Sequence, residues 1–202
     1  MAKSRGWIVA LMLVVFSVFP AAQRGGGGGR GAERPITRTT YESSEYGFRF
    51  PVPPDLDLYT PDQPGRYRGV FTERRIVYLV SPMRPEESIS VKYSEGVTEA
   101  DLTSYRTTAG TNPPQARLPG FATRGVTDVP IGKDGAKNAV SFVYEMTTPK
   151  TDKAPSVDMT LRQVVFIHKG RGFIITCETT RKRFDKVNKD TFDKFLSKIE
   201  FR

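Results

Sequence analysis

The chain has 202 residues, enough for one domain with a hydrophobic core plus an appendage. Charged residues make up 26% and apolar residues 38%, typical of a soluble globular protein, and 31 Lys and Arg against 22 Asp and Glu give a net charge of +9. The single cysteine, Cys177, excludes an intrachain disulfide, so stability must come from packing.

Residues 1–22 have the three parts of an export signal. Lys3 and Arg5 give a positive start, Trp7–Phe19 is an apolar run of 13 residues, and Pro20-Ala21-Ala22 forms a small-residue end. A membrane span needs about 20 apolar residues, so a cleaved signal peptide is favoured over an uncleaved anchor. We therefore expect an exported protein, periplasmic or extracellular, without a stable membrane span after cleavage.

Residues 23–37 follow as a glycine-rich stretch with five consecutive glycines between arginines. Such a sequence has no apolar side chains to bury and loses much entropy if it becomes ordered, which predicts a flexible linker. Nucleic-acid-binding segments of the RGG type repeat and contain aromatic residues, so we expect no nucleic-acid partner. The folded domain is then expected to span residues 38–202.

Within the domain, short runs of alternating or β-branched residues bounded by Pro, Gly and Asp predict strands. A loop is expected at Asp55–Gly69. The expected strands include Phe48 and Phe50 after a Tyr-Gly turn, Phe71–Val80, Ser88–Tyr93, Phe121–Val129 and Ala139–Met146.

The stretch Val157–Thr179 predicts a hairpin, because two apolar runs flank the turn sequence Lys169-Gly170-Arg171-Gly172. Strand side chains alternate between the two faces of a sheet, and here both rows contain apolar residues. We therefore expect a central strand pair that is covered on both sides. One row holds Met159, Leu161, Val165 and Ile167, a second holds Phe173, Ile175 and Cys177, and Val164, Phe166 and Ile174 face the other way.

Two helices are expected. Thr98 and Asp101 form a capping box that begins a short helix with Leu102, Tyr105 and Ala109 on one face. The second helix runs from Phe184 to about Ile199. Its apolar stripe, spaced i, i+3, i+4 and i+7, is made of Phe192, Phe195, Leu196 and Ile199. The order of elements predicts an α+β fold, an antiparallel β-sheet sandwich flanked by an inserted short helix and a C-terminal helix.

Nucleophilic catalysis requires a base within about 3 Å of a nucleophile. The only histidine is His168 and the only cysteine is Cys177. If Lys169 faces Gly172, then His168 faces Phe173 and Cys177 faces Val164, which places the pair about 13 Å apart along the strands. The spacing of residues does not exclude a Ser-His-Asp triad that includes His168, although the chain has no G-x-S-x-G nucleophile elbow.

A metal site would need carboxylates, because the chain has one histidine and one cysteine. Asp55/Asp57 and Glu86/Glu87 lack the spacing of known metal-binding loops, so no metal is expected. The glycine-rich segments Gly132–Gly135 and Gly170–Gly172 join strands rather than a strand and a helix, so no phosphate-binding loop and no cofactor is expected.

Clustered cationic residues are the remaining candidates for a functional surface. Such clusters usually form solvated faces, but together they are able to attract anionic partners such as envelope polymers or lipid headgroups. The predicted interaction patch consists of Arg74, Arg75, Lys169, Arg171, Arg181, Lys182 and Arg183.

Three stretches of the sequence resemble the PsbP-like α/β-sandwich superfamily. Tyr46-Gly47-Phe48-Arg49-Phe50-Pro51-Val52-Pro53 looks like its opening strand, and Gly135-Ala136 before the Val140–Met146 strand is similar to its G-x-x-A step. Gly172–Thr176, then Phe184-Asp185 and Phe192–Phe201, resemble its closing strand and helix. Together these stretches span most of residues 41–202. The superfamily includes a photosystem II extrinsic subunit, a Ran-binding import factor and many bacterial exported proteins, so the resemblance implies a non-catalytic binding module and transfers no site residues.

The leading hypothesis is an exported, non-catalytic binding or scaffold module of the cell envelope, with an envelope protein or an anionic envelope component as partner. The first alternative is an envelope hydrolase that uses His168, which requires a pocket with a carboxylate beside the histidine. The second is a carrier of a small apolar ligand, which requires a cavity between sheet and helix lined by residues such as Phe142 and Phe195.

The export signal leads to the first testable prediction. The intact mass of protein purified from the envelope fraction should correspond to a chain that begins near Gln23, because the signal peptide is removed during export. A full-length species starting at Met1 in the cytoplasm would contradict this prediction.

Overall fold

The computed structural model describes residues 39–71, 74–151 and 155–202. The predicted signal peptide at 1–22 and the predicted linker at 23–37 lie outside these residues. Among the helices in the described part of the chain, none is long and apolar enough to cross a bilayer.

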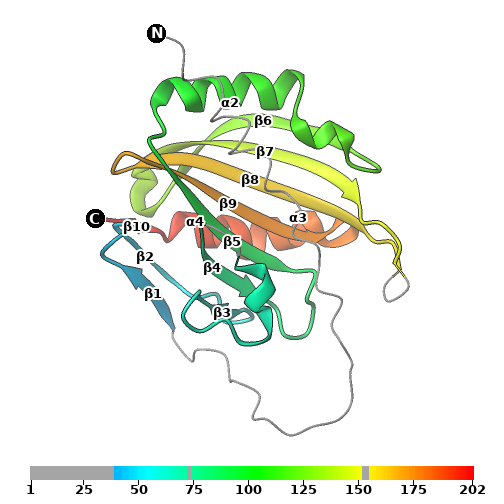
Figure 1. Ribbon diagram of the computed structural model, residues 1–202, viewed down its shortest axis with the longest axis horizontal. Helices are drawn as coiled ribbons and strands as arrows, with labels where there is room; N and C mark the ends of the chain where they lie inside the picture. Colours follow the sequence, from blue (N-terminus) through cyan, green and yellow to red (C-terminus); the bar gives the residue numbers. More distant parts are fainter. Residues whose placement is uncertain (1–38, 72–73, 152–154) are drawn as a thin grey trace, which may run out of the picture.

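Two antiparallel sheets form the framework of the domain (Figure 1). The larger sheet has seven strands in the order β3 (Asp57–Tyr59), β4 (Arg75–Val80), β5 (Ser88–Glu95), β9 (Arg171–Thr180), β8 (Asp158–His168), β7 (Lys137–Thr147) and β6 (Ala122–Ile131). The smaller sheet has the order β1 (Thr40–Ser43), β2 (Phe48–Pro51) and β10 (Glu200–Phe201).

The helical segments connect and cover these sheets. In chain order they are η1 (Gly65–Val70), α2 (Glu99–Thr111), η2 (Pro114–Arg117), η3 (Lys133–Gly135), η4 (Arg181–Arg183), α3 (Phe184–Val187), the π-helical turn η5 (Asn188–Phe192) and α4 (Asp193–Ser197). The predicted α+β sandwich with an inserted helix and a C-terminal helix is confirmed.

The β8–β9 hairpin lies in the middle of the large sheet, as the apolar pattern predicted. Its connection is shorter than expected. Lys169 and Gly170 form a two-residue turn with φ of 50° and 70°, the backbone that a type I′ turn requires. His168 therefore faces Arg171 and Cys177 faces Arg162, so the expected pairing of His168 with Phe173 is wrong by two residues.

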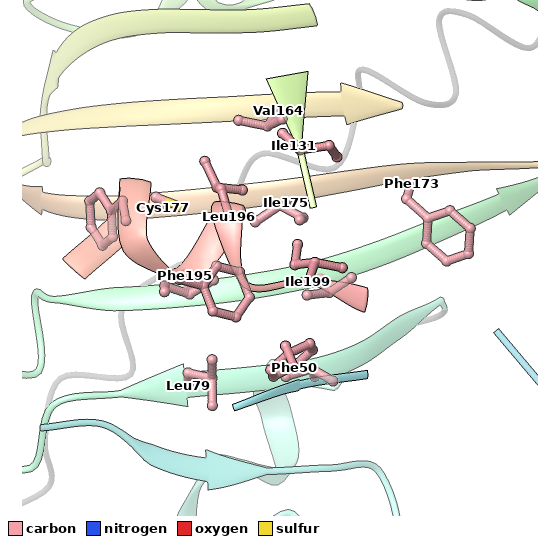
Figure 2. Packing of buried hydrophobic residues seen from close by; sticks show 14 of the residues in the cluster. Phe50, Leu79, Ile131, Val164, Phe173, Ile175, Cys177, Phe195, Leu196 and Ile199 are labelled. Carbon is pink, nitrogen blue, oxygen red and sulfur yellow. The ribbon is translucent and has the colours of Figure 1, made fainter. Parts of the chain in front are cut away.

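One face of the large sheet, here called the inner face, packs against the C-terminal helical segments and the smaller sheet. Phe195, Leu196 and Ile199 lie over strand β9, which carries Ile175 and Cys177 (Figure 2). The ring centroid of Phe195 is 4.9 Å from that of Phe50 on β2, which joins the two sheets through the helix. The predicted stripe is thus buried against the central hairpin.

The π-helical turn η5 keeps the C-terminal helical segments in register with the sheet. Val187 and Phe192 are both buried although they are five residues apart. In a regular α-helix that spacing rotates the second side chain by about 140° from the first. The wider π turn absorbs the extra residue, so both side chains face the core.

Arg162 lies beneath this turn, on the inner face of β8. Its Nε donates to Ser141 Oγ at 3.0 Å, and its Nη1 donates to Asn188 Oδ1 at 2.9 Å and to the Asp193 carboxylate. A buried arginine is tolerated only when its donors are paired, and here the partners lie at the beginning of η5 and directly after it. The sheet thereby fixes the position of the π turn.

The opposite, outer face carries two separate apolar clusters. Helix α2 begins with the predicted capping box of Thr98 and Asp101, and its buried residues are the three predicted from sequence, Leu102, Tyr105 and Ala109. These pack over β7 and β8. Beyond β5, the predicted loop Asp55–Gly69 contains β3 and much of η1, which form a smaller aromatic cluster with β4.

The docking of the C-terminal helix leads to a prediction of stability. Phe195→Ala should lower the free energy of unfolding by about 3–5 kcal/mol, because it removes a buried ring and leaves a cavity. Lys194→Ala, on the exposed side of the same helix, should change it by less than about 0.5 kcal/mol. Chemical denaturation measures both values, and equal effects of the two substitutions would contradict the packing of this helix.

Candidate interaction surface

Six of the seven predicted patch residues lie at the two ends of strand β9. Arg171 begins the strand and Thr180, next to Arg181, ends it, so the two groups lie about 30 Å apart at the usual rise per residue. Arg75 belongs to neither surface group, because its side chain is buried, with 4% of the residue exposed. The seven residues therefore do not form one patch.

At the C-terminal end of β9, segment η4 contains three cations, and carboxylates offset the charges of two of them. Arg181 Nε lies 3.0 Å from Glu145 and its Nη1 lies 3.8 Å from Asp158, while Arg183 pairs with Glu87. Lys182 is exposed between them. This end of β9 is a network of ion pairs that ties η4 to β7, β8 and the loop directly before β5.

The turn end of β9 brings together Arg74, Lys169 and Arg171: Arg74 directly precedes β4, Lys169 lies in the β8–β9 turn, and Arg171 begins β9. Arg74 donates from Nη1 to Ser94 Oγ at 3.0 Å, and Ser94 is the cross-strand partner of Gly172. Arg171 donates from Nη1 to the carbonyl oxygen of Glu45 at 2.8 Å, and its Nε lies 2.8 Å from a Glu95 carboxylate oxygen. The structure thus brings together one part of the predicted patch.

Two tyrosines complete this turn-end cluster. The guanidinium of Arg171 lies 5.5 Å from the ring centroid of Tyr46 and 5.8 Å from that of Tyr93, within the range of a cation–π contact. The two rings are 5.0 Å apart. Burial raises the pKa of the Tyr46 hydroxyl above its usual value, and the neighbouring Tyr93 and Glu45 add to the effect. The phenol therefore stays protonated and able to donate at neutral pH.

The backbone of the turn-end cluster is unusual at two cationic residues. Arg74 and Lys169 have φ of 70° and 50°, a left-handed conformation shared among the described non-glycine residues only with Asp134. This conformation disfavours side chains with a Cβ by roughly 1–2 kcal/mol, and glycine or asparagine usually occupies it. Long cationic side chains at both positions indicate a role for these residues beyond turn formation.

Neither tyrosine of the turn-end cluster was singled out from the sequence. Tyr46 belongs to the turn between β1 and β2, whereas Tyr93 lies on β5, and the register of β5 on β9 places Tyr93 opposite Phe173. The Arg171 that contacts both rings comes from a third segment. The only local signal was the Tyr-Gly pair at the start of the opening strand.

Arg75 instead takes part in a buried polar group on the outer face. It donates from Nη1 to the carbonyl oxygen of Val70 at 2.7 Å, and it lies in the electrostatic field of Glu178. Burial raises the pKa of Glu178, against the opposing effects of Arg75, Lys92 and a hydrogen bond from Ser88. Burial, with a smaller effect of Arg75, lowers the pKa of Lys92 to about 8.

His168 is a packed residue rather than a base beside a nucleophile. It is 7% exposed, its Nε2 lies 2.9 Å from the Gly47 carbonyl oxygen, and its ring centroid is 5.0 Å from that of Phe201. The contacts resolved for His168 in the described chain include no carboxylate of the kind that the hydrolase hypothesis required. Cys177 lies opposite Arg162, six positions along β8 from His168, or about 20 Å.

The carrier hypothesis placed Phe142 and Phe195 on one cavity between sheet and helix. The structure contradicts this, because Phe142 packs with α2 on the outer face and Phe195 packs on the inner face. Both side chains are fully buried in separate cores. Within residues 39–71, 74–151 and 155–202, no group of three His, Cys, Asp or Glu side chains is placed to hold a metal ion.

Comparison with solved structures identifies the fold. Cyanobacterial PsbP (CyanoP) from Synechocystis superposes with a TM-score of 0.51 over 89% of this chain and 99% of that chain, at 19% identity. A protein from Bacteroides thetaiotaomicron gives a TM-score of 0.53 at 10% identity, over 81% of this chain and 48% of that chain, so the present chain spans about half its length. No family model and no curated protein matches the sequence. The PsbP-like fold expected from the sequence is confirmed.

The burial of His168 leads to a prediction about pH. Burial lowers the pKa of His168, with the charges of Lys137 and Lys169 acting in the same direction and the hydrogen bond to Gly47 opposing it. The folded state therefore favours neutral histidine, and stability should fall as the pH drops below the unfolded value of about 6.5.

Replacement of this side chain isolates its share of the pH dependence. Urea denaturation between pH 7 and 5.5 should show a smaller loss of unfolding free energy for His168→Gln than for the parent, because glutamine has no proton to gain and keeps an N–H donor. Identical pH dependence in both proteins would show that His168 does not titrate differently on folding.

Proposed function

We propose that this chain, a protein with the PsbP-like fold, is an exported, non-catalytic binding module of the cell envelope. Its partner is an envelope protein, and the contact is made by the turn-end cluster of Arg74, Lys169, Arg171, Tyr46 and Tyr93. The observation that carries the proposal is the convergence of three cations and two tyrosines from four separate segments. The resemblance to the PsbP-like superfamily, which implies a binding module, supports the same conclusion.

The composition of the turn-end cluster is that of a protein interface. Arginine and tyrosine are enriched at the residues that contribute most binding energy, because they combine large contact area with directed hydrogen bonds. Arg171 is already held by Glu45, Glu95 and the two rings, so little side-chain freedom remains to be lost on binding.

The charge of the turn-end cluster favours a protein over a uniformly anionic surface. Glu45 and Glu95 are exposed beside the three cations, so the surface is mixed in sign with a small positive excess. A lipid or polymer surface of one sign would be repelled by these two carboxylates. A protein partner with its own acidic and polar groups complements both signs.

The export part of the proposal rests on the sequence pattern of residues 1–22 and on the composition of residues 23–37. After cleavage of the signal, the glycine-rich residues 23–37 would remain as a flexible N-terminal extension of the domain. In this arrangement the folded domain supplies the contact surface.

The proposal is tested by photo-crosslinking in cells. A benzoylphenylalanine residue replaces Glu45, at the rim of the turn-end cluster, and in a parallel strain it replaces Lys194 on the exposed side of the C-terminal helix. Irradiation should give a discrete protein adduct from position 45 and none of the same size from position 194. Equal products from both positions, or no adduct from position 45, would overturn the proposal.

Charge reversal supplies a matched control for this experiment. Arg74→Glu with Lys169→Glu should reduce the position-45 adduct at least tenfold, because the carboxylates that replace the two positive side chains repel an acidic partner. Lys186→Glu with Lys194→Glu makes the same charge change on the C-terminal helix and should leave the adduct intact. An adduct with lipid or glycan in place of protein would contradict the partner class proposed here.

A further inference from the structure

The outer face of the large sheet has a polar strip between its two apolar clusters. Strands β5 and β9 form the middle of this face, between the aromatic cluster of β3, β4 and η1 and the cluster under α2. The side chains that these two strands direct outward are largely polar, and five of them are buried: Ser88, Ser90, Ser94, Thr176 and Glu178. Buried polar groups need hydrogen-bond partners, so each of them has to be accounted for.

Tyr144 on β7, in the cluster under α2, is a buried polar group beside this strip whose hydroxyl is not hydrogen-bonded within the described chain. The residue is fully buried, and its hydroxyl has no hydrogen-bond partner in the described protein. Burial raises the pKa of this phenol well above its usual value, and the nearby Glu178 and Tyr105 contribute further. The hydroxyl is therefore a protonated donor, and a buried donor without an acceptor is strongly unfavourable.

Glu178 lies in the same row of the sheet as Tyr144. The register runs Tyr144, Leu161, Glu178 across β7, β8 and β9, so both polar side chains leave the same face about 10 Å apart at the backbone. The resolved hydrogen bond to this carboxylate comes from Ser88 Oγ at 3.4 Å, at the long limit for such a bond. The carboxylate has further lone pairs for a donor from the direction of Tyr144.

Gln163, in the neighbouring row, does not satisfy Tyr144. Its Oε1 already accepts from the Tyr105 hydroxyl at 3.3 Å and from Gln115 Nε2 at 3.2 Å, which uses both lone pairs of that oxygen. No other acceptor for the Tyr144 hydroxyl is resolved among the described residues. The adjacent Phe142 and Leu161 are buried and apolar, which favours a small neutral acceptor over an ion.

We propose that the Tyr144 hydroxyl and the Glu178 carboxylate hold an internal water site on the outer face of the sheet. The tyrosine donates to a water oxygen, and that water, alone or through a second one, donates to the carboxylate. A buried water usually makes two or more hydrogen bonds to polar groups whose donors or acceptors are not all used within the protein. The site is independent of the turn-end cluster, and it connects α2's side of the sheet with the polar group of Arg75, Lys92 and Glu178.

The direction in which one substitution shifts the midpoint of thermal unfolding tests the proposal. Tyr144→Phe in the full chain should lower the midpoint of thermal unfolding by about 2–4 °C, because the water loses its donor and the Glu178 carboxylate loses the water. If the site is dry, the same substitution removes an unpaired buried hydroxyl and should raise the midpoint. A raised or unchanged midpoint overturns the proposal.

A control and a direct observation complete the test. Thr160→Val removes another fully buried, unpaired hydroxyl, on the inner face, and should not lower the midpoint. A crystal structure that shows ordered solvent should contain a water within about 3.2 Å of the Tyr144 hydroxyl. An empty position there, or density for an ion or a larger molecule, would contradict the assignment of water.

Discussion

Burial of both faces of the β8–β9 hairpin is the constraint on which the rest of this fold depends. Neither row of side chains on these strands can face solvent, since Phe166 and Ile175 point one way and Val165 and Leu161 the other. An antiparallel sheet with one solvent-exposed face would bury only one of the two apolar rows. The chain therefore has to supply a cover for each side, and it uses α2 for one and the C-terminal segments with the small sheet for the other.

The two covers are held to the sheet by different kinds of interaction. Helix α2 begins at a capping box and packs a short apolar face, so its position is set mainly by local sequence and hydrophobic contact. The C-terminal cover is held in addition by a polar contact, because Arg162 reaches from the sheet to Asn188 and Asp193 around a π-helical turn. Polar contacts of this kind specify register more strictly than apolar packing does, since an unpaired buried arginine would be very costly.

The sequence predicted the parts of the structure that follow from local periodicity. Alternation located the long strands and their buried rows, and the spacing of Phe192, Phe195, Leu196 and Ile199 located the buried stripe of the last helix. Strands β3 and β10, of three and two residues, are too short to show alternation. The π turn was also missed, because a five-residue step from Val187 to Phe192 looks like a break in the stripe rather than part of it.

The composition of the candidate site depends on how distant strands pair, and the sequence alone did not predict that pairing. Arg74 and Arg75 are neighbours in the chain, yet Arg74, which precedes β4 with a left-handed backbone, is exposed and donates to Ser94, whereas Arg75 on β4 is buried near Glu178. Charge alone grouped seven cations, whereas the fold placed them in three environments. Tyr46 and Tyr93 became visible as partners of Arg171 only after the strands were paired.

The position of Cys177 in the central hairpin has a consequence for how the chain behaves outside its native state. The thiol is completely buried, and burial raises its pKa to about 12, so the reactive thiolate is almost absent in the folded protein. An oxidant or an alkylating reagent therefore reaches the sulfur only when the C-terminal helical segments that cover this face of β9 move away. Modification of this single thiol would mark molecules that have lost this cover, and its rate would report how often the cover opens.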